Sequence, residues 1–197
     1  MKVECIADNI LELEQSISPY EFCFLQKTLG EKSGISSELW KGNHYDVNCI
    51  SIVKGRVSFY ISQESDPVPS SYPHQFFKIV DSRISQYCGM YKKSKKGQLL
   101  ITFKEWALEN SFYSNLIDRE PRELEIFRTY KRLMLLEFPD PKLKIQGQIL
   151  KDNWVMCPEC NEAWEVFDNS GILICPKCSK YQNNPLYRTP KELNVFE

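Results

Sequence analysis

Four cysteines near the end of the chain have the spacing of a metal site. They form two Cys-Pro-x-Cys pairs, at residues 157–160 and 175–178, with fourteen residues between the pairs. A Cys-x-x-Cys turn directs two thiols toward one point, and two such turns supply the four ligands of one tetrahedral zinc ion. Four protein ligands leave no coordination position for water or substrate, so the pattern predicts one structural Zn²⁺ ion. The predicted ligands are Cys157, Cys160, Cys175 and Cys178.

The same thiols admit two other interpretations. A rubredoxin-type iron or iron–sulfur site uses similar ligands, and spacing alone does not distinguish iron from zinc. A redox-active Cys-x-x-Cys needs its first thiol at a helix N-terminus in a βαβ unit, and a second pair is then superfluous. Zinc is therefore the preferred interpretation, and iron stays an alternative.

Short strands are expected to position these thiols. Residues 143–149 alternate in a strand-like way and lead through Trp154 into the first pair. Residues 163–167 and 172–175 flank the turn signal Asp-Asn-Ser-Gly at residues 168–171. We therefore expect the segment between the two pairs to form a β-hairpin.

Residues from about Trp154 to Tyr181 resemble a zinc ribbon. Two C-P-x-C knuckles are joined by the expected hairpin, and an aromatic residue follows each pair, Trp164 after the first and Tyr181 after the second. The resemblance implies the same four cysteine ligands. It indicates metal binding but does not specify a function.

The N-terminal part of the chain contains a well-defined helix start. Ser18 is the expected N-cap, Pro19 occupies the first helical position, and Glu21 completes a capping box. The helix is expected over residues 19–29 and should stop at Gly30.

Further helices are expected closer to the middle of the chain. Residues 76–87 carry apolar side chains at helical spacing, and Gly89 is the expected end of that helix. Thr102 and Glu105 repeat the capping-box spacing ahead of a short helix. Another helix should begin at a proline and cover residues 121–137.

Strand patterns complete an α+β body over residues 1–140, in which helices pack with a small antiparallel sheet. Residues 46–62 predict a hairpin, and residues 98–101 predict a further short strand. The expected buried face of the hairpin consists of Ile50, Ile52, Val57, Phe59 and Ile61. A Phe-Pro-Asp-Pro break at residues 138–141 marks the expected boundary to a zinc-ribbon module, residues 141–197, packed on the body.

Composition limits the functional classes. The chain has 197 residues, 42% of them apolar, with a net charge of −1, so no overall charge attracts it to nucleic acid or an anionic membrane. The sequence shows neither a leader segment nor an apolar run able to span a bilayer, which predicts a cytoplasmic protein with no membrane partner. The four single cysteines are expected to be reduced and mostly buried. They are Cys5, Cys23, Cys49 and Cys88.

Local charge disfavours nucleic-acid binding by the ribbon itself. Residues 154–180 contain four carboxylates and two lysines, and four thiolates around Zn²⁺ add further negative charge. Phosphates would be repelled by such a module, because affinity for a nucleic-acid backbone depends on positive charge. We expect its exposed aromatic side chains to pack on protein surface instead.

Basic residues concentrate elsewhere, over residues 78–104, where seven lysines and arginines accompany only Asp81. The centre of this segment is a patch that could bind an anionic partner, formed by Lys92, Lys93, Lys95 and Lys96. The alternative is a solvated loop after a helix C-terminus, where lysines suit the helix dipole.

Catalytic motifs are not evident. The two histidines, His44 and His74, lie in segments expected to be loops, and neither adjoins a recognisable nucleophile motif. The paired carboxylates Glu123 and Glu125 are expected on a solvated helix face with local ion pairs.

Three functional hypotheses follow. The first is a non-enzymatic cytosolic binding protein that recognises a protein partner, of adaptor type or resembling toxin-neutralising immunity proteins in general composition. The second is RNA or DNA binding through the patch at residues 92–96. The third is an enzyme of unrecognised type.

Overall fold

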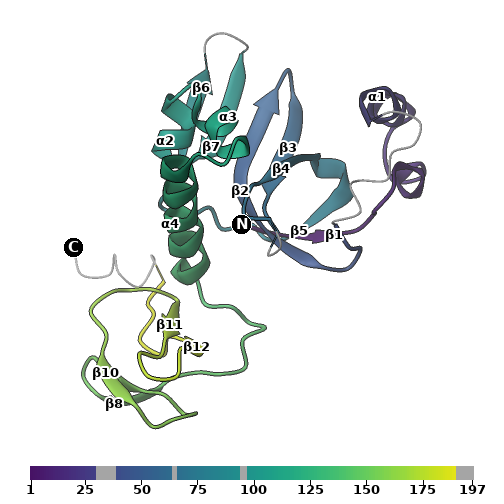
Figure 1. The fold of residues 1–197 in the computed structure, drawn as a ribbon. Coiled ribbons are helices and arrows are strands. Elements are labelled where there is room, and N and C mark those ends of the chain that lie inside the picture. The colour runs from purple at the N-terminus through teal and green to yellow at the C-terminus, as the bar shows by residue number, and fades with distance from the viewer. Residues whose placement is uncertain (30–38, 64–65, 94–96, 190–197) are drawn as a thin grey trace, which may run out of the picture. The chain divides into compact units, whose positions relative to one another are not determined.

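The computed structural model describes residues 1–29, 39–63, 66–93 and 97–189. Named strands pair only in antiparallel fashion within these ranges, and helices accompany them, so the expected α+β class is confirmed (Figure 1). The chain separates into two compact units, Met1–Tyr130 and Lys131–Glu197. That division falls inside a helix, and the boundary expected at residues 138–141 stays a prediction.

The N-terminal unit is built on a seven-stranded antiparallel sheet, which is larger than the sequence patterns indicate. Its central path has the order β4-β3-β2-β1-β5, while β7 pairs with β2 and β6 pairs with β7. The strands are β1 (Lys2–Cys5), β2 (His44–Val53), β3 (Arg56–Ile61), β4 (Ser70–Pro73), β5 (Phe77–Asp81), β6 (Gly89–Lys93) and β7 (Gln98–Thr102). Two single turns of 3-10 helix are present: η1 (Ile10–Leu13) precedes helix α1 (Pro19–Leu29), and η2 (His74–Phe76) precedes β5.

The predicted hairpin of β2 and β3 is confirmed. Lys54 and Gly55 form its two-residue turn with φ of 51° and 78°, the left-handed conformations that a tight hairpin turn requires. Within the expected buried face, Phe59 and Ile61 are 4% and 1% exposed. Ile52 remains partly exposed, so this face of the sheet is only partly covered.

Helix α1 (Pro19–Leu29) begins as predicted. The Ser18 hydroxyl accepts a hydrogen bond from the Glu21 backbone N–H, and the Glu21 carboxylate accepts one from the Ser18 N–H. Leu25 of this helix belongs to the first hydrophobic core. The buried members of this core are Val3, Cys5, Ala7, Ile10, Leu13, Leu25, Leu39, Val47, Phe59, Ile61, Tyr72, Phe76 and Phe77. The stop expected at Gly30 lies outside the described residues.

The helix predicted over residues 76–87 is wrong. Phe77–Asp81 forms strand β5, which pairs with β1, and Gly89 begins strand β6 instead of ending a helix. Ile79 and Val80 are β-branched residues that suit a strand, and both are exposed. The apparent helical spacing therefore does not correspond to a buried stripe, and pairing with β1 determines the local structure.

Three helices lie beside β6 and β7 (Figure 1). They are α2 (Lys104–Leu108), α3 (Phe112–Ile117) and α4 (Pro121–Glu137). The predicted bounds of α4 are confirmed. The capping box predicted at Thr102 is wrong, because Thr102 is fully buried and its hydroxyl donates to the carbonyl oxygen of Asn48 at 3.2 Å.

An aromatic core joins these helices to the sheet. Phe103 stacks on Tyr130 with ring centroids 4.2 Å apart, and Trp106 stacks on Tyr113. The buried members of this second core are Cys49, Leu100, Phe103, Trp106, Phe112, Leu116 and Phe127. Helices α2, α3 and α4 thus cover one face of the sheet. The first core, which includes Leu25 of α1, lies on the other face.

Five short strands form the described β-structure of the C-terminal unit. They are β8 (Gln148–Lys151), β9 (Trp154–Met156), β10 (Ala163–Glu165), β11 (Ile172–Ile174) and β12 (Tyr181–Asn183). Strand β9 lies between β8 and β10, whereas β11 pairs only with β12. The hairpin predicted between the two cysteine pairs is therefore wrong, since its two halves, β10 and β11, belong to different sheets.

Candidate metal centre

Each Cys-x-x-Cys pair forms the turn of its own hairpin. The first pair lies in the turn between β9 and β10, and Met156 of β9 pairs with Ala163 of β10 next to this turn. The Cys157 N–H donates to the carbonyl oxygen of Glu162 at 2.8 Å, and the Asn161 N–H donates to the carbonyl oxygen of Cys157 at 2.9 Å. Asn161 has a φ of 58°, a left-handed conformation that asparagine tolerates and that closes the turn.

The second pair repeats this geometry between β11 and β12. The Cys175 N–H donates to the carbonyl oxygen of Lys180 at 3.0 Å, and the Ser179 N–H donates to that of Cys175 at 2.9 Å. Ser179, the counterpart of Asn161, has a φ of 57°. The two knuckles are thus the same local structure formed twice.

The four sulfur atoms come together with the dimensions of a tetrathiolate metal site. All four Sγ atoms lie within 4.8 Å of one another. Cys157 Sγ is 3.8 Å from Cys178 Sγ, and Cys160 Sγ is 3.6 Å from Cys175 Sγ. A tetrahedron with Zn–S bonds of about 2.3 Å has edges of about 3.8 Å, so the sulfurs fit a zinc ion. All four cysteines are free thiols, and a disulfide would need sulfurs about 2.0 Å apart.

Backbone N–H groups favour the ionised form of these thiols. Burial disfavours the Cys175 thiolate, but N–H groups of Cys178 and Lys177 donate to its sulfur, and the pKa of Cys175 is lowered. The Glu162 N–H favours ionisation of Cys160 in the same way, yet burial and the neighbouring thiols raise the pKa of Cys160 to about 12. Several thiolates in one cluster repel each other, and a divalent cation among them removes that repulsion.

Charged side chains pair across the two knuckles. Lys180 of the second knuckle pairs with Glu159 of the first, and Lys177 lies 3.5 Å from Glu162. The two lysines expected from the sequence thus neutralise two of the local carboxylates. These ion pairs are exposed and contribute little stability, but each one connects a side chain of one knuckle to a side chain of the other.

The hydrophobic core of this unit is small. Its buried cluster consists of Val155, Val166 and Leu173, with Trp164 and Leu186 partly buried against it. Strands β9 to β12 have three residues each. A structure of this size gains too little from apolar burial alone, which is the situation in which a structural metal supplies folding free energy.

Polar contacts connect the loops of the unit. The Asn183 side-chain amide donates to the carbonyl oxygens of Asp140 and Leu143, and its oxygen accepts from the Asp140 N–H at 2.9 Å. Gln182 is fully buried, and neither of its side-chain polar atoms has a hydrogen-bond partner among the described residues. Sequence patterns did not single out either residue.

The predicted basic patch falls on a strand. Lys92 and Lys93 lie on β6, and residues 77–91 directly before them form β5, a non-helical connection and the start of β6. The interpretation as lysines after a helix C-terminus is therefore wrong. Lys95 and Lys96 lie outside the described residues. Binding of an anionic partner by this patch stays a prediction.

The two histidines lie in different settings. His44 is exposed at the first position of β2, not in a loop. His74 begins the 3-10 turn η2, and its Nδ1 lies 3.2 Å from the carbonyl oxygen of Val57. A hydrogen bond to backbone fits a structural role for His74.

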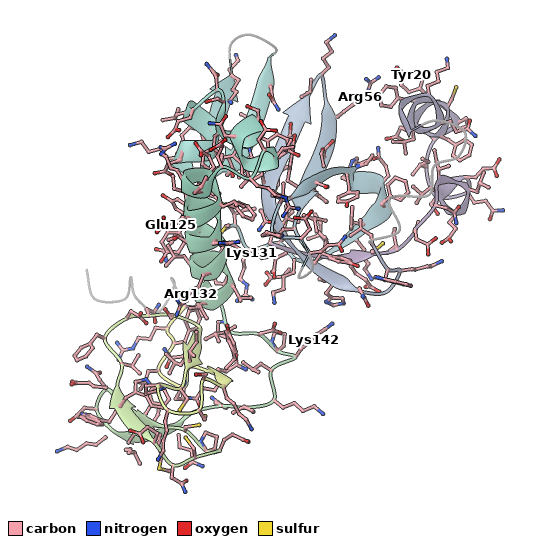
Figure 2. All side chains as sticks on the ribbon, viewed as in Figure 1. Tyr20, Arg56, Glu125, Lys131, Arg132 and Lys142 are labelled. Carbon is pink, nitrogen blue, oxygen red and sulfur yellow. The ribbon has the colours of Figure 1, made fainter. Side chains whose placement is uncertain are left out.

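One predicted surface carboxylate is buried. Glu123 of α4 is 4% exposed, and its carboxylate accepts hydrogen bonds from Arg122 at 2.9 Å and from the Asn115 amide at 3.3 Å. Arg122 also binds Glu109 through two nitrogen atoms. One ion pair within the helix, between Arg122 and Glu123, is present, but Glu123 lies on the inner side of the helix. Glu125, labelled in Figure 2, is exposed as predicted.

The single cysteines are free thiols as expected. Cys5 and Cys49 are buried, whereas Cys23 is exposed and Cys88 is half-buried. Burial raises the pKa of Cys49 to about 12, so this thiol is neutral at physiological pH.

No family model, curated protein or solved structure matches this chain. Within the described residues, none of the helices combines the length and apolarity that crossing a bilayer requires. The thiol cluster is therefore the feature from which function must be inferred.

Proposed function

We propose that Cys157, Cys160, Cys175 and Cys178 hold one structural zinc ion, and that the chain is a non-enzymatic cytosolic binding protein that recognises another protein. The sulfur tetrahedron carries the zinc part of the proposal, because its dimensions match Zn–S coordination and its four ligands leave no open position for catalysis. Iron is the alternative metal for the same four sulfurs.

Exposed apolar side chains on the C-terminal unit support a protein partner. Phe167 is 84% exposed. Four more large apolar residues of this unit are exposed, namely Ile149, Leu150, Trp154 and Tyr181. Aromatic side chains with this exposure are enriched at protein interfaces and contribute strongly to binding there. The four free thiols outside the cluster support a reducing, cytosolic compartment.

Metal analysis tests the zinc part. Protein purified without added metal should contain about one zinc per chain, and Co²⁺ exchanged into the site should give the intense visible absorption of a tetrahedral thiolate complex. Bound iron, or a coordination shell with an exchangeable water, would contradict the proposal.

Affinity purification tests the binding part. The tagged full-length chain, treated with nuclease, should retain a protein at fixed stoichiometry through size-exclusion chromatography in reducing buffer. Recovery of nucleic acid alone, with affinity that falls steeply with salt, would favour RNA or DNA binding instead. The narrower adaptor or immunity role depends on the identity of that partner.

A further inference from the structure

One face of the large sheet carries apolar side chains beyond the limits of either core. Cross-strand partners lie on the same face of a sheet, so the strand registers define two rows across β3, β2, β7 and β6. The first row is Val57, Ile52, Leu99 and Lys92. The second row is Phe59, Ile50, Ile101 and Met90.

Exposure increases along these rows from β3 toward β6. Phe59 is 4% exposed, whereas Met90 at the other end of the second row is 68% exposed. Ile50 and Val57 pack against the first core. The remaining apolar members, Ile52, Leu99, Ile101 and Met90, belong to neither of the two cores that the described residues of this unit form. We call these four residues the outer face.

Strand β6 is also an edge of the sheet. It pairs with β7 on one side, and among the described strands it has no second neighbour. An unpaired edge presents backbone N–H and C=O groups that can accept another strand. The outer face therefore reaches the free edge at Met90, and Lys92 lies on the same side of β6 two residues away.

The charge around this edge is positive. The two segments of sequence that carry the outer face, residues 47–62 and 89–104, contain no aspartate or glutamate. The basic residues of these segments that the structure describes are Lys54, Arg56, Lys92, Lys93 and Lys104. Lys92 is exposed and has no ion-pair partner among the described residues. A segment that pairs with β6 would place one of its side chains beside Lys92, where a carboxylate is favoured.

We infer that β6 accepts an extended acidic segment of the protein partner as an added antiparallel or parallel strand. The segment has an apolar side chain beside Met90 and, two residues away, a carboxylate beside Lys92. The centre of the surface is aliphatic, so it lacks the aromatic platforms on which nucleic-acid bases stack. This inference rests on the proposed function and adds a surface on the N-terminal unit, with the chemistry of the partner segment that it would bind.

Peptide binding to the zinc-loaded full-length chain tests the inference. The probe is a fluorescent eight-residue peptide, Val-Thr-Glu-Thr repeated twice, in which a valine and a glutamate two residues apart lie on the same face of the strand; its binding is measured by anisotropy. It should bind, and Met90→Glu and Lys92→Glu should each weaken it at least tenfold. Lys78→Glu is the matched control on β5, another edge strand of the same sheet, and should change affinity less than twofold. Circular dichroism should show that all three variants fold.

Altered probes separate strand addition from simple charge attraction. The N–H groups of an extended peptide point alternately to its two edges, and only one edge faces β6. N-methylation along that edge removes the donors that bond to β6 and should abolish binding, whereas N-methylation along the other edge should not. Peptides in which serine replaces both valines (the serine–glutamate peptide) or lysine replaces both glutamates (the valine–lysine peptide) should bind at least tenfold more weakly. Equal binding of the serine–glutamate peptide, tolerance of methylation on both edges, or preference for single-stranded oligouridine would overturn the inference.

The natural partner distinguishes this inference from the proposed function. If an isolated protein partner binds wild type and Lys92→Glu equally, the β6 surface is wrong although the binding function stands. If no protein partner exists, the proposed function itself fails. Self-association of Lys92→Ala with unchanged peptide affinity would mean that the lysine only protects the edge, which also overturns the inference.

Discussion

Cys160 Sγ lies 3.6 Å from Cys175 Sγ, although fourteen residues separate the two cysteines in the chain. Strands β10 and β11, which begin and end the intervening segment, do not pair with each other. The two knuckles therefore meet through their turns, and a metal ion at the centre of the four sulfurs would be the strongest connection between the two hairpins.

Metal removal should unfold the C-terminal unit selectively. Zinc binding and folding of so small a structure are one equilibrium, whereas the N-terminal unit has its own two cores. With a chelator at neutral pH, amide hydrogen exchange should become fast in residues 148–183 and stay slow in strands β2 and β3. Protection retained in β9 to β12 after zinc loss would contradict a structural metal.

Cys157→Ser should have the same effect without a chelator. Cys157 is fully buried, and without its thiolate only three ligands remain for the metal. The C-terminal unit then loses much of the folding free energy that structural zinc supplies, so its free energy of unfolding should fall by roughly several kcal/mol. The matched control is Cys23→Ser, because Cys23 is an exposed thiol outside the cluster. Thermal unfolding with zinc analysis should show lost metal and a lower Tm in the first variant only.

Gly171→Ala should destabilise the C-terminal unit with its metal ligands intact. An added Cβ would lie 2.2 Å from backbone atoms of Phe138 and Pro139, and backbone cannot move aside as a flexible side chain can. We expect a loss of about 1–3 kcal/mol, as for other overpacked sites. Gly97→Ala is the comparison, since a Cβ there meets nothing within 4 Å and only the positive φ opposes it.

Chemical denaturation distinguishes Gly171→Ala from Gly97→Ala. Gly171→Ala should lower the midpoint of the C-terminal transition, and Gly97→Ala should affect only the N-terminal one, by about 1 kcal/mol. Equal behaviour of both variants in the C-terminal transition would mean that the contact with residues 138–139 does not constrain Gly171.

The N-terminal unit should lose stability at alkaline pH because of Cys49. Burial raises the pKa of Cys49 from 9.0 to about 12. Below pH 9 both states keep the proton, so the thiol has no effect. Between pH 9 and 12 the unfolded thiol ionises while the folded one stays neutral, so stability falls by roughly 1.4 kcal/mol per pH unit.

Urea midpoints at pH 8, 9.5 and 11 measure this decline, and Cys49→Ala should make it shallower. Tyr113 contributes in the same direction at higher pH, because burial raises its pKa from 10.0 to about 12. The same slope in wild type and Cys49→Ala would show that Cys49 ionises equally in both states.

Local signals predicted the elements that they control directly. The capping box of Ser18 and Glu21, the Lys54-Gly55 turn and the start of α4 at Pro121 are all present as expected. Each depends on residues within a few positions of one another. The helix prediction for residues 76–87 failed because β5 forms by pairing with β1, which is more than 70 residues away in the sequence.

The candidate metal site likewise depends partly on local sequence and partly on long-range strand pairing. Its four candidate ligands follow from the Cys-x-x-Cys turns, whose geometry is set within five or six residues, so the sequence by itself indicated which thiols cluster. Which strands carry the turns was decided by tertiary pairing, since β10 joins β9 and β11 joins β12. The outer face beside β6 was likewise invisible in the sequence, because a sheet face is formed by residues from distant strands whose register only the folded chain establishes.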